Sequence, residues 1–335
     1  MANNNIPEIS VIIPFKNEGK TICYILDSLE KQSTDIPFEV ILADGCSTDD
    51  TVDIIKAHPL NKKAEVIVIP LPPDNHGMTV ARNMAAEKAR GKYLVFSQSD
   101  IQVEDPQALE KIAIALEADD AAGTYCIMNG VGKDDFESYD FWGKVVNARY
   151  LNNVNKLDFS TKFNAVKHET FKKMNGFDDK RYAWGGEDFD FEVRLSREGK
   201  IVETDIVGNH LHGLGRRQTA GGLVNKFCRN AEVMGACYLG YVKYMNFKPG
   251  LKNMIIKEAM LCLLVLSCLV PHIWPWSFLL VFLAGIAWQA DAYKYIRDWK
   301  LICLPFFGFY IMFCFTFFFL KGIMLQSTSV RLDAS

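Results

Sequence analysis

The sequence has no excess of basic residues and no cysteines at a close spacing. Its 335 residues include 37 Lys and Arg against 40 Asp and Glu, for a formal net charge of -3. Non-specific nucleic-acid binding requires basic patches that displace counterions from phosphates, so we expect no nucleic-acid partner. The nine cysteines are scattered without metal-ligand spacing, which favours reduced packing residues in a reducing compartment.

Two further signals are absent near the N-terminus. Neither a positively charged segment nor an apolar run precedes Ile9, so we expect no signal peptide to export this chain. No Gly-x-Gly-x-x-Gly follows the first predicted strand. Its absence disfavours a dinucleotide-dependent oxidoreductase.

Long apolar runs are concentrated near the C-terminus. Residues 259–270 and 276–288 are typical of a helical hairpin with a proline-containing break, and 301–320 forms a third run. A membrane-spanning helix needs about 20 apolar residues. We therefore expect two or three transmembrane helices, and a buried helical subdomain is the alternative.

Basic residues precede the first apolar run and lie between the second and third. By the positive-inside rule both stretches are cytoplasmic. The predicted location is the inner (cytoplasmic) membrane, with the N-terminal domain in the cytoplasm. The predicted organisation is an α/β domain over residues 1–220, an amphipathic interfacial linker over 221–252, a membrane region over 253–325 and a tail over 326–335.

The N-terminal half alternates short strand-like runs with helical patterns. Apolar, largely β-branched runs cover residues 9–14, 38–43, 65–70 and 93–96, and helical periods follow the first three. This alternation predicts a mostly parallel central sheet with helical crossovers. In such sheets ligands bind at the carboxyl ends of the strands.

Polar residues stand at those strand ends. Asp44 follows the second strand, and Gln98 and Asp100 follow the fourth. Arg82 lies on the helix after a loop containing Gly77. Guanidinium suits bidentate phosphate binding, and a carboxylate suits a divalent cation held against a diphosphate. Plain turn chemistry for Asp44 and a solvated helix arginine are the alternatives.

The most specific segment is Trp184-Gly185-Gly186-Glu187-Asp188. The glycines allow a sharp turn, tryptophan offers a flat face for a sugar ring, and the acids begin a helix whose dipole favours their ionised form. An ionised carboxylate beside a hydroxyl is what a general base requires. Further on, His210 and His212 follow a predicted strand over residues 201–207, and at most one of them is expected to be a metal ligand.

In this order, over about residues 8–215, the segments resemble the family 2 glycosyltransferases with the GT-A fold. The resemblance rests on Pro14-Phe15-Lys16-Asn17-Glu18, Asp44-Gly45-Cys46-Ser47-Thr48-Asp49, Asn75 with Gly77 and Ala81-Arg82-Asn83, Gln98-Ser99-Asp100, and Trp184 to Asp188. One departure stands out. Gln98 replaces the first aspartate of the family's Asp-x-Asp motif.

The resemblance implies a role for each matched residue. It places the nucleotide sugar against Pro14, Lys16, Glu18, Asp44, Arg82, Gln98 and Asp100, and the acceptor against Trp184, Gly185 and Gly186. Asp188 is then the catalytic base and Glu187 supports it. A divalent cation, Mg²⁺ or Mn²⁺, is held by Asp100 with His210 or His212.

The implied reaction is inverting transfer of a sugar from a UDP- or GDP-linked donor. The membrane region suggests a lipid-linked or other glycan acceptor at the cytoplasmic leaflet, in cell-surface polysaccharide synthesis. The alternative is a catalytically impaired membrane scaffold or binding protein with the same fold, and Gln98 motivates it.

Overall fold

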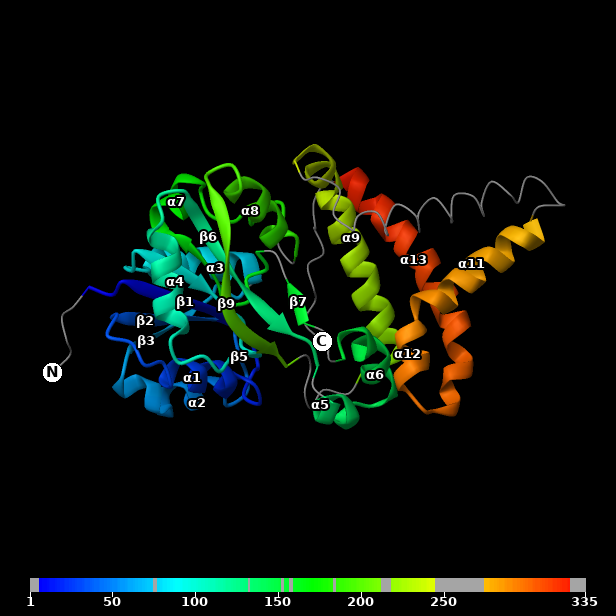
Figure 1. Cartoon of the computed structure of the whole chain (residues 1–335), viewed down its shortest axis with the longest axis horizontal. Coiled ribbons are helices and arrows are strands. Elements are labelled where there is room, and N and C mark those ends of the chain that lie inside the picture. The colour runs from blue at the N-terminus through cyan, green and yellow to red at the C-terminus, as the bar shows by residue number, and fades with distance from the viewer. Residues whose placement is uncertain are drawn as a thin grey trace. The chain divides into compact units, whose positions relative to one another are not determined.

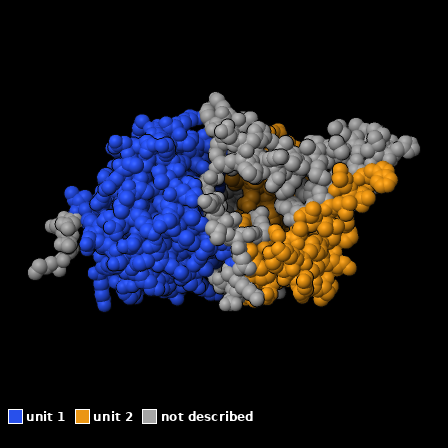
Figure 2. Space-filling model, viewed as in Figure 1, with its two compact units in different colours: residues 1–131, 152–215, 329–335 blue, residues 132–151, 216–328 orange. Residues whose placement is uncertain are grey.

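The computed structural model describes residues 6–74, 77–131, 133–151, 154–156, 159–182, 185–211, 218–244 and 274–325. The predicted site residues Trp184 and His212, the first apolar run and the tail lie outside them. The chain divides into two compact units, shown in Figure 2. Unit 1 comprises residues 1–131, 152–215 and 329–335, and unit 2 comprises 132–151 and 216–328.

The described elements of unit 1 alternate strand and helix through most of their order (Figure 1). The strands are β1 (Ile9–Phe15), β2 (Phe38–Asp44), β3 (Glu65–Pro70), β4 (Tyr93–Phe96), β5 (Ile101–Val103), β6 (Ala121–Asn129), β7 (Val154–Lys156), β8 (Asn164–Lys167) and β9 (Lys200–His210). The helices are α1 (Ile22–Glu30), α2 (Thr51–Ala57), η1 (Pro59–Lys62), α3 (Met78–Lys88), α4 (Ala108–Glu117), α7 (His168–Lys173) and α8 (Glu187–Leu195).

These strands form one sheet in the order β3-β2-β1-β4-β8-β6-β9-β5, and β7 pairs with β6. The strands β1 to β4 are parallel, as predicted, but β8 runs antiparallel to both β4 and β6, and β5 antiparallel to β9. The sheet is therefore mixed rather than mostly parallel. Between β6 and β8 the chain leaves unit 1, passes through residues 132–151 of unit 2, and re-enters unit 1 before β7.

Two apolar layers enclose the sheet. Val11 and Ile13 of β1 face a core built with α1, α2 and α4, whereas Ile12 faces a second core built with α3, α7 and α8. The alternation follows from the two-residue period of a strand. In the second core, Phe177 and Phe191 pack with ring centroids 4.7 Å apart, and this contact fixes the base of α8.

The described part of unit 2 is helical. It contains α5 (Lys133–Ser138), α6 (Phe141–Asn147), η2 (Ala148–Tyr150), α9 (Ala220–Tyr244), α11 (Trp274–Trp288), α12 (Ala290–Tyr295), η3 (Trp299–Cys303) and α13 (Leu304–Leu325). Among the described residues, one stretch, Trp299–Leu325, is long and apolar enough to cross a membrane by length and composition. The number of membrane helices stays a prediction.

The pair α9 and α13 packs through two glycines. A Cβ at Gly235 would meet the carbonyl oxygen of Phe319, and a Cβ at Gly322 would meet that of Glu232. Small residues let helix backbones approach closely. Lys321 joins the same contact, since its Nζ donates to the buried Glu232 carboxylate at 3.0 Å.

Replacing Gly322 by alanine tests this packing. An added methyl in a helix normally stabilises by about 0.5–1 kcal/mol relative to glycine, but here overpacking costs about 1–3 kcal/mol. We expect Gly322→Ala to lower the melting temperature of the detergent-solubilised chain by circular dichroism. Gly221→Ala is the control, because a Cβ there meets nothing within 4 Å. This variant should not lower the melting temperature. Equal stabilisation by both variants would contradict the packing.

Candidate functional site

The carboxyl ends of β1, β2 and β4 meet at one edge of the sheet. The register pairs Phe15 with Asp44 and Ile12 with Phe96. The loops that follow these strands, which carry Lys16, Asp44 and Gln98, therefore emerge together, as the strand-helix alternation predicts. Lys16 and Gln98 are each partly buried.

The loops after β1 and β2 are tied to each other. The amide of Asn17 donates to the Ser47 hydroxyl at 3.0 Å, and the Asn17 side chain accepts from the Thr48 amide at 2.8 Å. The amide of Glu18 donates to the Thr51 hydroxyl at 2.9 Å. These bonds order the predicted donor-binding segment from Pro14 to Glu18.

Asp44 stabilises the turn after β2 and keeps a carboxylate oxygen available for a ligand. Its Oδ1 accepts a hydrogen bond from the Ser47 amide at 2.8 Å, the local turn chemistry expected of aspartate. Its Oδ2 accepts no hydrogen bond from the described residues. The carboxylate thus keeps one oxygen for a ligand's N–H groups, and the two interpretations of this residue are compatible.

Arg82 forms an ion pair that the sequence did not predict. Its guanidinium contacts the Glu187 carboxylate, and the two side chains are only 1% and 4% exposed. The Nε of Arg82 and the Oε2 of Glu187 have no hydrogen-bond partner among the described residues. A direct contact of Arg82 with the donor stays a prediction, because its described partner is the first residue of α8.

Glu187 carries opposing influences on its pKa. Burial raises the pKa above its ordinary value, the adjacent Arg82 charge lowers it, and the neighbouring Asp188 raises it. Desolvation disfavours the charged form of a carboxyl group, whereas an opposite charge in contact favours it. Because Arg82 is always protonated, we treat the pair as ionic.

The first turn of α8 is set by glycines and by α3. Gly185 and Gly186 adopt φ values of 148° and 88°, which favour glycine. Asp188 follows them, partly buried, and its Oδ1 accepts from the Phe189 amide at 2.8 Å. On α3, the Asn83 side chain exchanges hydrogen bonds with the backbone of Phe177 at 2.8 and 3.0 Å. The Arg82 and Asn83 contacts together position Asp188.

Asp100 and His210 lie together. The strand β5 begins beside the end of β9, where Ile101 pairs with His210, and the His210 ring nitrogen Nε2 is 3.2 Å from the Asp100 carboxylate. Among the described residues, no group of three His, Cys, Asp or Glu side chains is placed to hold a metal. Mg²⁺ sites often use one or two protein ligands with phosphate oxygens and water. The pair fits such a site, completed by a diphosphate.

Lys162, which sequence reasoning missed, interacts electrostatically with two of these acids. The partly buried Lys162 precedes β8, and burial lowers the pKa of its ammonium while Asp188 and Asp100 raise it. The charges of the two carboxylates therefore both act on one cation. The segment around Lys162 has no apolar periodicity that would have placed it, and only the antiparallel pairing of β8 with β4 brings it to this edge.

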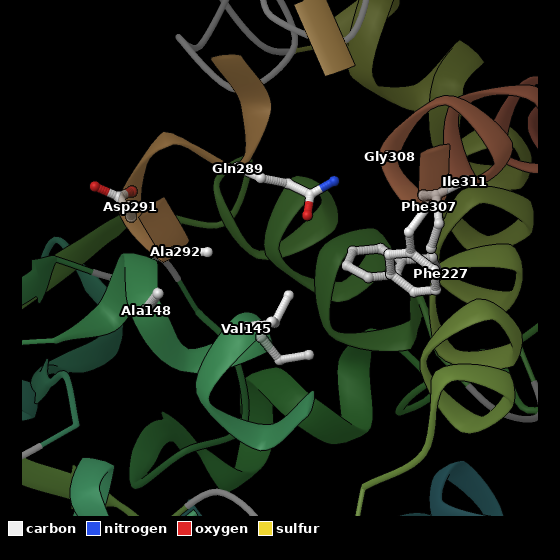
Figure 3. A pocket seen from close by; sticks show the side chains of 10 residues that line it. Val145, Ala148, Phe227, Gln289, Asp291, Ala292, Phe307, Gly308 and Ile311 are labelled. Carbon is white, nitrogen blue, oxygen red and sulfur yellow. The ribbon is translucent and has the colours of Figure 1, made fainter. Parts of the chain in front are cut away.

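Unit 2 contains a separate apolar cavity of about 50 Å³ (Figure 3). Its lining includes Val145 of α6, Phe227 of α9 and Phe307 of α13. Gln289 donates through Nε2 to the Leu304 carbonyl at 3.1 Å, and its Oε1 has no described partner. The cavity can hold a few water molecules and is too small for a nucleotide sugar.

A family model described as "Glycosyl transferase family 2" matches residues 10–174. The chain carries a family 2 glycosyltransferase domain. A second model, described as "N-terminal domain of galactosyltransferase", matches residues 159–207 and thus the part of the glycosyltransferase domain that contains α8. Together the two matches include the described site residues from Pro14 to Asp188.

Named relatives cover part of the same domain. The chain is 38% identical over 96 residues to poly(ribitol-phosphate) beta-N-acetylglucosaminyltransferase TarS of Staphylococcus aureus, which is 28% of this chain and 16% of TarS. It is 39% identical over 95 residues to the putative teichuronic acid biosynthesis glycosyltransferase TuaG of Bacillus subtilis, 28% of this chain and 36% of TuaG. The matched regions thus span about a third or less of either relative.

A solved structure supports the predicted GT-A fold. Mannosyltransferase PcManGT from Pyrobaculum calidifontis, in complex with GDP-Man and Mn²⁺, matches with a TM-score of 0.53 at 18% identity. The match covers 96% of this chain and 86% of PcManGT. At this identity the likeness concerns the fold of the glycosyltransferase domain.

Because the Arg82–Glu187 pair is buried, we expect a single variant to be much less stable than a double variant that removes both charges. Arg82→Met leaves a buried carboxylate unpaired, which should lower the free energy of unfolding by about 3–5 kcal/mol in urea titrations. Arg82→Met with Glu187→Leu should recover much of that loss, because no buried charge remains.

The control is the exposed pair of Lys173 and Glu198, at 2.5 Å with Lys173 70% exposed. Lys173→Met should change the free energy of unfolding by at most about 1 kcal/mol. A loss in Arg82→Met no larger than that of the control would show that the buried pair is not a structural requirement.

Proposed function

We propose that this chain is an inverting glycosyltransferase that transfers a sugar from a nucleoside-diphosphate sugar to an acceptor hydroxyl. The observation that carries the proposal is the placement of Asp188. It lies in the first turn of α8, within residues 159–207 that match the galactosyltransferase domain model, and its charge, like that of Asp100, raises the pKa of the Lys162 ammonium. A carboxylate for base catalysis and a carboxylate for the diphosphate thus belong to one site.

The donor binds along the carboxyl edge of the sheet. The free oxygen of Asp44 accepts an N–H group of the base, and the ordered segment of Pro14, Lys16 and Glu18 forms the adjoining wall. Gln98 offers an amide hydrogen bond to the ribose. The donor is UDP- or GDP-linked, and the complex of PcManGT with GDP-Man supports this donor class.

A divalent cation, Mg²⁺ or Mn²⁺, fits between the donor and the pair of Asp100 and His210. These residues would hold it, and His212 is the alternative imidazole, outside the described residues. When bound, the cation supplies positive charge to the leaving diphosphate. The Mn²⁺ in the PcManGT complex supports this assignment.

Asp188 accepts the proton of the acceptor hydroxyl as that oxygen attacks the anomeric carbon. The bond between the anomeric carbon and the phosphate oxygen breaks on the opposite face, its electron pair stays on the nucleoside diphosphate, and the configuration inverts. Glu187, held by Arg82, keeps the turn that carries Asp188 in place. Trp184, Gly185 and Gly186 form the acceptor side of the site.

The acceptor is proposed to be a lipid-linked glycan intermediate at the cytoplasmic leaflet of the inner membrane. Large apolar side chains are exposed along the helices α11 and α13, including Trp276, Leu283, Phe306, Phe313 and Phe317. An exposed apolar surface of this kind marks contact with lipid or protein. The names of TarS and TuaG, a poly(ribitol-phosphate) transferase and a teichuronic acid enzyme, support a role in cell-surface polymer synthesis.

A second candidate function is a binding or scaffolding protein with an impaired site. Gln98 favours it, because the amide carries no charge where the family has an aspartate. Calorimetry with UDP and GDP, with and without Mn²⁺, separates the two functions. Binding of neither nucleotide would support the scaffold.

Removal of the base tests the transferase directly. Asp188→Asn keeps the shape but accepts no proton, so kcat should fall by about 10²–10⁴-fold while donor affinity stays within severalfold of the wild type. The assay is release of nucleoside diphosphate with membrane extract as acceptor.

Asp190→Asn is the matched control, since Asp190 lies in the same helical turn and pairs with Arg194 at 2.8 Å. It should retain most of the activity. A wild-type rate in Asp188→Asn would exclude the base assignment.

The two histidines make distinct predictions for metal use. His210→Ala should raise the Mn²⁺ concentration needed for half-maximal transfer by about tenfold or more, because it removes one of few protein ligands. His212→Ala is the comparison, and its half-maximal Mn²⁺ concentration should stay near that of the wild type. A shift in His212→Ala alone would reassign the ligand.

A further inference from the structure

Lys162 lies where the sheet register brings β8 to the end of β4. Asn164, the first residue of β8, pairs with Phe96, the last residue of β4, and the strands are antiparallel. The segment that precedes β8, with Lys162, and the loop that follows β4, with Gln98, therefore lie at the same end of this strand pair.

The backbone on both sides of Lys162 is held in an uncommon conformation. Thr161 and Phe163 adopt φ values of 54° and 66°, which non-glycine residues rarely take. The buried Asn164 side chain accepts from the Lys162 amide at 2.8 Å and from the Ser160 amide at 3.3 Å. Such conformations persist only where the surroundings impose them, and they concentrate at ligand sites.

The Lys162 ammonium is left without a hydrogen-bond or ion-pair partner among the described residues. Its surroundings nevertheless contain two carboxylates, Asp188 and Asp100, whose charges oppose the fall in its pKa that burial causes. A partly buried ammonium is costly unless it finds an anion. A phosphate is the compact anion that lysine binds as a point charge.

We propose that Lys162 contacts the diphosphate of the nucleotide sugar and serves as a protein-borne cation for the leaving group. This inference rests on the proposed function and deepens it. Lys162 neutralises part of the charge that remains on the phosphate oxygen when the bond to the anomeric carbon breaks. It stays protonated throughout, because the acceptor proton goes to Asp188. Its positive charge takes over part of the role of a metal ion, because Gln98 lacks the negative charge with which an aspartate would help to hold one.

The test is calorimetry on the detergent-solubilised full chain with EDTA present, using UDP and GDP and, in parallel, uridine and guanosine. Lys162→Met keeps the length of the side chain and removes its charge. We expect its affinity for the nucleoside diphosphate that the wild type binds to fall by about tenfold or more, the effect of losing a charged hydrogen bond. Affinity for the nucleoside should not change, because the nucleoside has no phosphate.

Two further variants separate charge from structure. Lys162→Arg should restore most of the diphosphate affinity. Lys172→Met, which removes an exposed lysine of α7, should bind as the wild type does. Thermal unfolding of Lys162→Met should match or exceed that of the wild type, since a buried charge has been removed.

Each other outcome overturns the inference. If Lys162→Met binds the diphosphate as well as the wild type, or loses affinity for nucleoside and diphosphate equally, the lysine has no phosphate contact and the proposed function is unaffected. If the wild type binds no nucleoside diphosphate with or without Mn²⁺, the proposed function fails and this inference fails with it.

Discussion

The buried ion pair between Arg82 and Glu187 is the contact on which the site depends. It joins α3, which follows the third strand, to the first turn of α8, more than a hundred residues later in the chain. Ions lose their hydration when buried, so each member is tolerated only while the other is present. The contact therefore couples the stability of unit 1 to the position of the carboxylate next to Glu187. Arg82, predicted to contact the donor, and Asp188, proposed to activate the acceptor, share one structural support.

The sequence predicted the elements whose signals are local. The strands β1 to β4 and the helix α3 lie where apolar runs and helical periods indicated, and Asp44, Gln98 and Asp100 stand at strand ends as expected. The direction of β8 was not predictable, because no local residue pattern indicates with which strands it pairs or in which direction. Lys162 was missed for the same reason. The burial of Arg82 was missed because its partner is distant in sequence. The local sequence around a helical arginine does not reveal whether its side chain contacts solvent, a phosphate or a carboxylate.

The ionisable side chains of the site interact in opposed sets. Arg82 lies against Glu187, His210 lies against Asp100, and the charges of Asp100 and Asp188 both act on Lys162. In a partly desolvated site these interactions are stronger than in water. Replacement of the first motif aspartate by Gln98 shifts the balance toward positive charge. A polyanionic donor is the kind of ligand that such a balance favours.

Residues 132–151 interrupt the sequence of unit 1 and belong to unit 2, so no single cut of the chain separates the two units. The chain crosses between them after residues 131, 151, 215 and 328. Within unit 2, Trp142 of this segment packs on Phe307 of α13 with ring centroids 4.7 Å apart, and α6 also contacts α9 and α12. A glycosyltransferase domain cut at residue 215 would keep this segment and lose the helices that cover it. Unit 2 is therefore harder to exchange between proteins than a simple C-terminal tail would be.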